Sequence, residues 1–167
     1  MDKTQNNVPF IELEVKKQLN KIKEGFDGLK KLKIIRTNNI TGELGEHYAA
    51  KLLNLTRTDN KNNEGFDAVD NKGKKYEIKT RLSPNENTYR TLFGGFSNSD
   101  RFPFDFFICV NLNTYFEPIS IIKFPYELVM KNLDSRKRFI LKKELMKSKG
   151  VEILYSSEKM PDYMWKT

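Results

Sequence analysis

Three ionisable residues in the middle of the chain have the types and spacing that metal-assisted hydrolysis requires. Asp67 precedes Glu77, and one residue separates Glu77 from Lys79. Carboxylate oxygens are preferred ligands of magnesium, and a lysine beside the metal would orient or help deprotonate an attacking water. Phosphodiester hydrolysis needs an in-line nucleophile, charge neutralisation and help for the leaving oxygen, and one or two hard cations supply most of this. The residues therefore predict a Mg²⁺ site, in which Mn²⁺ could substitute.

A β-hairpin over residues 65–81 is the element that would bring these side chains together. The pattern predicts strands over 66–70 and 74–81, joined by the three residues 71–73, with Gly73 where a left-handed backbone is needed. Asp70 then pairs with Lys74 and Asp67 lies opposite Glu77, so both carboxylates share one face. Lys79 follows on that face, roughly 6.6 Å along the strand. A four-residue loop would place Asp67 on the other face, and a five-residue loop would restore it.

A helix predicted over residues 42–55 could supply a third carboxylate. Residues 38, 39 and 41 are good caps before it, and capping of the helix dipole is the alternative role of its acids. At about 100° per residue from Leu44, the apolar residues fill an arc from about 0° to 180°, with Glu46 near 200° and Glu43 near 260°. We therefore expect Glu46 at the edge of the buried face, able to reach a cleft beside the sheet. Glu43 should point to solvent.

The order of Glu46 on a helix, then Asp67, then Glu77-Ile78-Lys79, resembles the PD-(D/E)XK nuclease superfamily over about residues 42–124. The resemblance implies an α/β fold with a restriction-endonuclease-like mixed β-sheet flanked by α-helices. It also implies Asp67, Glu77 and the backbone carbonyl of Ile78 as metal ligands, Lys79 as the catalytic lysine and Glu46 as an auxiliary ligand. Phe66 stands where the name-giving proline would be. The alternative is a polar hairpin whose Glu77 and Lys79 face solvent.

Composition agrees with one domain over residues 1–167, with a helical extension over 1–36 and a core over 42–124. The 30 Lys and Arg outnumber the 22 Asp and Glu, for a net charge of +8. Such a charge favours a polyanion, either nucleic acid or an anionic membrane surface. Because no 18-residue apolar run is present and the N-terminus lacks a signal-peptide layout, we expect a cytoplasmic protein without a membrane partner.

The remaining metal-binding residue types are scarce. A single cysteine, Cys109, lies in an apolar run and is predicted to be a small buried residue, and His47 is the one histidine. Any metal would therefore be held by oxygen ligands, most plausibly as magnesium or manganese.

Apolar residues at steps of four and three predict an amphipathic helix over residues 10–32, at 15, 19, 22, 26 and 29. We expect this stripe to pack on the chain's own domain, and a helix-mediated dimer contact is the alternative. Farther along, residues 105–112 predict a central strand and 116–124 another that starts at an edge or bulge at Pro118. A short helix to about residue 133 and a last strand over 151–155 complete the pattern.

Arginines interleaved with aromatics after the hairpin could follow a phosphate backbone and stack on bases. Arg81, Arg90 and Arg101 are the predicted nucleic-acid contacts, and the alternative is that the neighbouring aromatics complete the core. Residues 131–149 hold eight basic and two acidic residues, which indicates a second phosphate-contacting face or simply a solvated helix.

Together these features predict a metal-dependent endonuclease acting on DNA. The alternatives are a non-catalytic nucleic-acid-binding module with the same fold and an RNA-cleaving nuclease. A double-strand cut would call for a homodimer, and membership of a larger nucleic-acid-processing assembly is the other expectation.

Overall fold

The computed structural model describes residues 12–58, 65–83, 91–96 and 104–157. The chain divides into two compact units, residues 1–38 and residues 39–167. In the part of the chain that is described, no helix has the length and apolar character needed to cross a bilayer.

The first unit contains helix α1 (Leu13–Lys31), within the predicted range. No residue of α1 is buried within this unit, and packing of its apolar stripe on the chain's own domain stays a prediction. Leu19 is 50% exposed and Ile22 is 56% exposed. The apolar spacing therefore predicted the helix itself correctly. The dimer contact remains a prediction.

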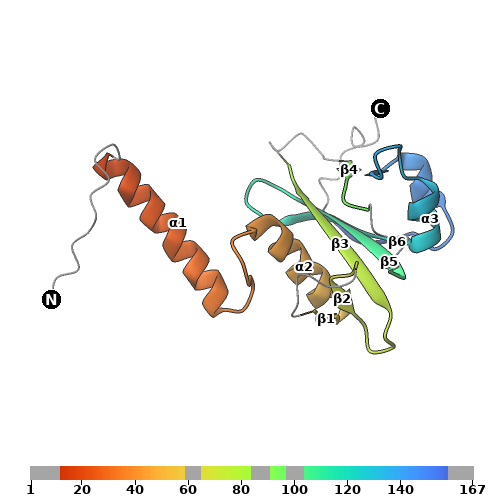
Figure 1. Cartoon of the computed structure of the whole chain (residues 1–167), viewed down its shortest axis with the longest axis horizontal. Helices are drawn as coiled ribbons and strands as arrows, with labels where there is room; N and C mark the ends of the chain where they lie inside the picture. Colours follow the sequence, from red (N-terminus) through yellow and green to blue (C-terminus); the bar gives the residue numbers. More distant parts are fainter. Residues whose placement is uncertain (1–11, 59–64, 84–90, 97–103, 158–167) are drawn as a thin grey trace. The chain divides into compact units, whose positions relative to one another are not determined.

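The second unit is a mixed α/β fold built on one large sheet (Figure 1). Within the described residues the sheet has six strands in the order β1-β2-β3-β5-β6-β8. Only β3 and β5 run parallel among these pairs, and the other neighbours are antiparallel. The strands are β1 (Thr56–Arg57), β2 (Ala68–Val69), β3 (Lys75–Leu82), β5 (Phe106–Leu112), β6 (Pro118–Pro125) and β8 (Glu152–Ser156).

Several strand predictions are confirmed. Strand β5 lies between β3 and β6, and Phe107 to Leu112 are all buried, as expected of a strand covered on both faces. Strand β6 begins at Pro118, where the register with β5 shifts, so this proline marks the predicted irregularity. Helix α3 (Tyr126–Lys131) follows β6 directly.

A second, two-stranded sheet pairs β4 (Leu92–Phe93) with β7 (Phe139–Ile140). A 3-10 helix, η1 (Lys143–Lys147), follows β7. The basic stretch 131–149 is thus the end of α3, a short strand and a 3-10 turn, rather than the solvated helix offered as one interpretation.

Helix α2 (Ile40–Leu53) begins at the predicted cap, where the Asn39 side chain accepts a hydrogen bond from the Gly42 N–H at 3.4 Å. The helix meets the sheet through Gly45, because a Cβ built there would lie 1.7 Å from Oγ1 of Thr80. The buried face of α2 thus combines the small residues Gly45, Ala49 and Ala50 with Leu44 and Glu43.

The expectation that Glu43 points to solvent is wrong. Glu43 is 1% exposed and its carboxylate lies 3.7 Å from Nη1 of Arg57 on β1. The prediction placed the buried face along the whole apolar arc from Leu44, whereas close approach at Gly45 turns the helix so that Leu52 is 46% exposed and Glu43 faces inward.

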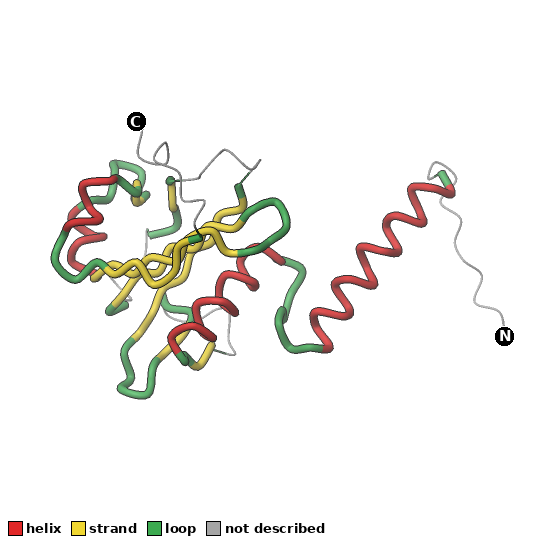
Figure 2. The backbone as a smooth tube through the Cα atoms, turned by 180° about the vertical axis from the view of Figure 1, so that it is seen from behind, coloured by secondary structure: helices red, strands yellow, loops and turns green. Residues whose placement is uncertain are grey.

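The two faces of the sheet carry different layers (Figure 2). Helix α2 covers the face that contains Thr80. The opposite face carries the main aromatic core, in which Phe107 packs edge-on against Phe93, Phe96 and Phe139. Cys109 is fully buried in this core, and burial raises the pKa of its thiol. The interpretation that the aromatics near residue 93 complete the core is thus confirmed for Phe93 and Phe96.

Candidate functional site

The β2–β3 hairpin has the register that the sequence predicted. Ala68 pairs with Tyr76 and Val69 with Lys75, and the Asp70 N–H donates to the Lys74 carbonyl at 3.0 Å. Gly73 has a φ of +76°, the left-handed conformation that glycine adopts without strain. The Asp70 carboxylate fixes the turn by accepting from the backbone N–H groups of Lys72 and Lys74. The three-residue loop 71–73 is therefore confirmed.

Asp67 lies in a bend just before β2, whose last pair with β3 joins Ala68 to Tyr76. Its Oδ2 accepts a 2.7 Å hydrogen bond from the backbone N–H of Ile78. Its own N–H donates to the Tyr76 carbonyl at 2.8 Å. Backbone bonds therefore hold the Asp67 carboxylate beside the Glu77-Ile78-Lys79 segment of β3.

Glu77 and Lys79 form an ion pair on β3, in which Nζ of Lys79 donates to Oε1 of Glu77. The two side chains are only 13% and 20% exposed, so the interpretation of a solvent-facing pair is not supported. Lys79 also lies over the ring of Phe96, 5.1 Å from its centroid. A Cβ built on Gly95 would lie 3.3 Å from the Lys79 Nζ, so the Gly95-Phe96 segment encloses this ammonium group.

The electrostatics of Glu77 show that the predicted residues interact. The pKa of Glu77 is raised to about 7, first by burial of its carboxyl group and then by the negative charge of Asp67. The charge of Lys79 and its hydrogen bond oppose this shift, while Glu46 adds a small effect that raises the pKa. Two carboxylates that repel one another in a buried setting, with a lysine beside them, form a site that favours a bound cation.

Glu46 comes from helix α2, whereas Glu77 and Lys79 belong to β3. Its helix packs on the Thr80 face, whereas Lys79 contacts Gly95 and Phe96 on the opposite face, since neighbouring residues of a strand alternate between faces. Among the described residues, no group of three or more Asp, Glu, His or Cys side chains could hold a metal together. Glu46 therefore influences Glu77 through its charge, and its role as a ligand stays a prediction.

The donor set fits a hard cation that retains water ligands. The carboxylates of Asp67 and Glu77 and the backbone carbonyl of Ile78 are oxygen donors, and magnesium is commonly bound through one or two carboxylates plus waters and substrate oxygens. The raised pKa of Glu77, caused by burial and by Asp67, is the observation that supports this fit. A cage of protein ligands alone would need more donors than these residues provide.

Of the predicted arginines, Arg81 lies within the described residues, and Arg90 and Arg101 lie outside them. Arg81 follows Lys79 on the same face of β3. Its Nε donates to the Leu92 carbonyl at 2.8 Å, and its guanidinium lies 5.8 Å from the centroid of the Phe93 ring. Arg81 thus joins β3 to β4 beside the site, and nucleic-acid contact by it remains a prediction.

Two features near the site could not be read from the sequence. The enclosure of Lys79 by Gly95 and Phe96 depends on how β4 lies against β3, although the adjacent glycines 94 and 95 in an aromatic stretch were a visible signal. The Glu43–Arg57 ion pair depends on the rotation of α2, for which the three small residues of its buried face were the signal.

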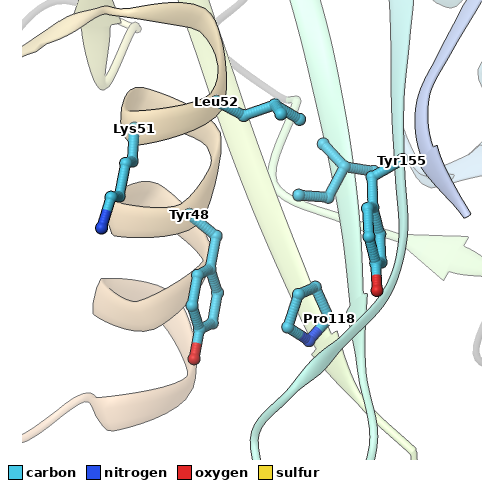
Figure 3. Close-up of a pocket in the computed structure, with 6 residues that line it drawn as sticks. Tyr48, Lys51, Leu52, Pro118 and Tyr155 are labelled. Atoms are coloured by element: carbon cyan, nitrogen blue, oxygen red, sulfur yellow. The ribbon is translucent and has the colours of Figure 1, made fainter. Parts of the chain in front are cut away.

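A separate pocket lies on the α2 side of the sheet (Figure 3). Tyr48 and Leu52 of α2 face Pro118 and Tyr155 across it. The Tyr48 hydroxyl donates to the Phe116 carbonyl at 3.1 Å. Because no carboxylate lines this largely apolar pocket, it is not an extension of the Asp67–Glu77–Lys79 site.

Comparison of the sequence with models of protein families and with curated proteins finds no match.

Proposed function

We propose that the chain is a metal-dependent endonuclease that hydrolyses DNA phosphodiester bonds. The observation that carries the proposal is the gathering of Asp67, Glu77 and Lys79 along β3, where the Asp67 carboxylate accepts from the Ile78 N–H, Lys79 pairs with Glu77, and Asp67 raises the pKa of Glu77. A partly buried cluster of two carboxylates and one lysine has the composition that metal-assisted phosphoryl chemistry requires. The net charge of +8 supports a polyanionic substrate.

Each residue has a distinct part in this proposal. Asp67, Glu77 and the Ile78 carbonyl would hold Mg²⁺ or Mn²⁺, which when bound neutralises charge on the attacked phosphoryl group and helps the leaving oxygen. The Ile78 N–H keeps the Asp67 carboxylate oriented through its 2.7 Å hydrogen bond. Lys79 would orient the attacking water and stabilise negative charge in the transition state, and the neighbouring Phe96 ring limits its movement.

The same proposal covers the fold family and the setting of the protein. We propose a restriction-endonuclease-like sheet and membership of the PD-(D/E)XK superfamily. We also propose that the protein acts in the cytoplasm, as a homodimer or within a larger nucleic-acid-processing assembly. The mixed six-stranded sheet of the described residues and the order Glu46, Asp67, Glu77, Lys79 are compatible with them.

The test is to incubate supercoiled plasmid, linear DNA and structured RNA with the protein in magnesium, in manganese and in chelator. We expect metal-dependent nicking or linearisation of DNA that falls by at least about 100-fold in Asp67→Ala and Lys79→Ala. Lys72→Ala is the matched control, because Lys72 is an exposed lysine in the turn of the same hairpin. This control should cleave at the wild-type rate.

The outcomes separate the alternatives. Cleavage that persists unchanged in both site variants would rule out this site assignment. Binding of DNA without cleavage in any metal would favour the non-catalytic module, and metal-dependent loss of RNA alone would favour an RNA-cleaving nuclease.

A further inference from the structure

Most of the chain's excess positive charge lies in one short segment. Residues 131–149 contain eight basic and two acidic residues, a net charge of +6, against +8 for the whole chain. Seven of these cations are exposed and define what we call the basic surface: Lys131, Arg136, Lys137, Lys142, Lys143, Lys147 and Lys149.

The basic surface is a packed part of the fold. Phe139, Leu141 and Leu145 are buried in the aromatic core, at 0%, 3% and 8% exposure. Exposed Lys142 and Lys143 lie between buried Leu141 and Leu145, and exposed Lys147 follows two residues after Leu145, so the core anchors the backbone that carries these lysines. One of the two acids, Asp134, pairs with Arg138 and accepts hydrogen bonds from the N–H groups of Arg136 and Arg138. Its charge therefore offsets Arg138 rather than the exposed lysines.

A chain of contacts leads from this segment to the candidate site. Strand β7 of the segment pairs with β4, and the Leu141 N–H donates to the Thr91 carbonyl at 2.8 Å. A Cβ built on Gly94, just after β4, would lie 3.7 Å from Cγ of Arg138. The next residue, Gly95, encloses the Lys79 ammonium. Strand β4 therefore connects the segment 131–149 to Lys79, and all three lie on the same face of the sheet.

We propose that the basic surface binds the phosphate backbone of DNA and leads it to the Asp67–Glu77–Lys79 site. The inference rests on the proposed function, because it assigns the surface to the same substrate. Closely spaced, exposed lysines suit phosphates, which they contact as point charges without reading sequence. Phosphates bound on this surface would also bring the scissile phosphate of the same strand toward Lys79.

The binding test compares two triple variants with the same loss of charge. Lys142→Gln/Lys143→Gln/Lys147→Gln removes three of the seven cations of the basic surface. The control Lys21→Gln/Lys31→Gln/Lys51→Gln removes three exposed lysines elsewhere. Fluorescence anisotropy with a labelled DNA duplex, in chelator to prevent cleavage, gives affinity across a salt series. Circular dichroism verifies that each variant is folded.

For the basic-surface variant we expect at least about a tenfold loss of affinity, and a salt slope shallower by about 3 because three phosphate contacts are gone. The control should change affinity by less than about threefold, as expected for long-range charge alone. Equal losses in the two variants, or no loss in the basic-surface variant, would overturn the proposal. Tighter binding of structured RNA than of the duplex would also overturn it.

A second measurement locates the contact directly. Cys109 is the single cysteine of the chain and is fully buried, so Lys143→Cys provides an accessible thiol for a photo-crosslinker. We expect DNA to cross-link from this position and not from Lys51→Cys, and the reverse result would contradict the proposal. If the protein cleaves DNA but DNA does not cross-link at position 143, only the role of the basic surface is refuted. If DNA cross-links there but is not cleaved in any metal, only the proposed endonuclease function is refuted.

Discussion

The raised pKa of Glu77 has a consequence for stability that is independent of catalysis. Burial and the charge of Asp67 raise the pKa of Glu77 from 4.5 to about 7. Between these values the folded protein binds more protons than the unfolded chain, so the free energy of unfolding falls as pH rises. The stabilisation associated with protonated Glu77 is present below about pH 4.5 and lost through about pH 7. A bound cation would offset this loss by neutralising the two carboxylates.

The first prediction is that Glu77→Gln removes this pH dependence. Glutamine resembles protonated glutamate, so wild type and variant should have similar stability near pH 4. At pH 8, without metal, the free energy of unfolding of the variant should exceed that of the wild type by about 1 to 3 kcal/mol more than it does near pH 4. Urea denaturation in chelator across this pH range measures it. Parallel stability curves for the two proteins would show that burial does not perturb Glu77 as proposed.

Gly95 supports a second prediction, because its backbone position sets the space around Lys79. Gly95 has a φ of +90°, and a Cβ added to it would lie 3.3 Å from the Lys79 Nζ. Gly95→Ala should therefore cost about 1 to 3 kcal/mol of stability and displace the ammonium group. We expect the cleavage rate of Gly95→Ala to fall more than its affinity for DNA, because Gly95 acts by positioning Lys79.

The matched control is Gly94→Ala, whose Cβ would meet the Arg138 side chain at an ordinary 3.7 Å. Thermal denaturation and single-turnover cleavage should be nearly unchanged in this control. If both glycine variants lose the same activity, the effect comes from the loop in general and not from contact with Lys79.

The hairpin and helix α2 differ in how far the sequence determined them. The hairpin register was predictable because it depends on local chemistry: Gly73 in a left-handed turn and Asp70 bonded to the turn backbone. The rotation of α2 could not be predicted in this way. It depends on close approach of Gly45 to Thr80, which lies 35 residues farther along the sequence. Long-range contact therefore decided that Glu43 is buried and that Lys79 is enclosed by Gly95 and Phe96.

Close packing of α2 on β3 gives a third prediction. In Gly45→Ala the new methyl group would lie 1.7 Å from Oγ1 of Thr80, so the helix must shift and stability should fall by at least about 2 kcal/mol. Thr80→Ala removes that hydroxyl, which has no hydrogen-bond partner in the described structure. The double variant should therefore lose less stability than the sum of the single variants, as measured by urea denaturation.

Gly25→Ala is the control for this prediction, because a Cβ added at Gly25 in helix α1 would have nothing within 4 Å of it. Alanine favours helix over glycine, so this variant should not destabilise the protein. Strict additivity of the Gly45 and Thr80 variants would show that the two residues do not pack as described.

At the scale of the whole molecule, charge is distributed unevenly. Residues 131–149 carry +6 of the net +8, and residues 12–36 carry eight basic and four acidic residues. The rest of the chain is therefore slightly acidic, and it contains the Asp67–Glu77–Lys79 cluster. Binding and catalysis are thus assigned to surfaces with different exposure to solvent ions, which salt should affect differently.

The last prediction uses this difference. Exposed lysines are screened strongly as ionic strength rises from about 50 to 200 mM, and phosphate contacts release counterions, so KM for DNA should rise at least about tenfold. The Glu77–Lys79 pair is mostly buried, with side chains 13% and 20% exposed, and is screened less. The kcat at saturating DNA should therefore change by less than about twofold. Steady-state cleavage across a salt series at constant metal concentration measures both constants, and a kcat that falls as steeply as kcat/KM would place the salt-sensitive charges in the site itself.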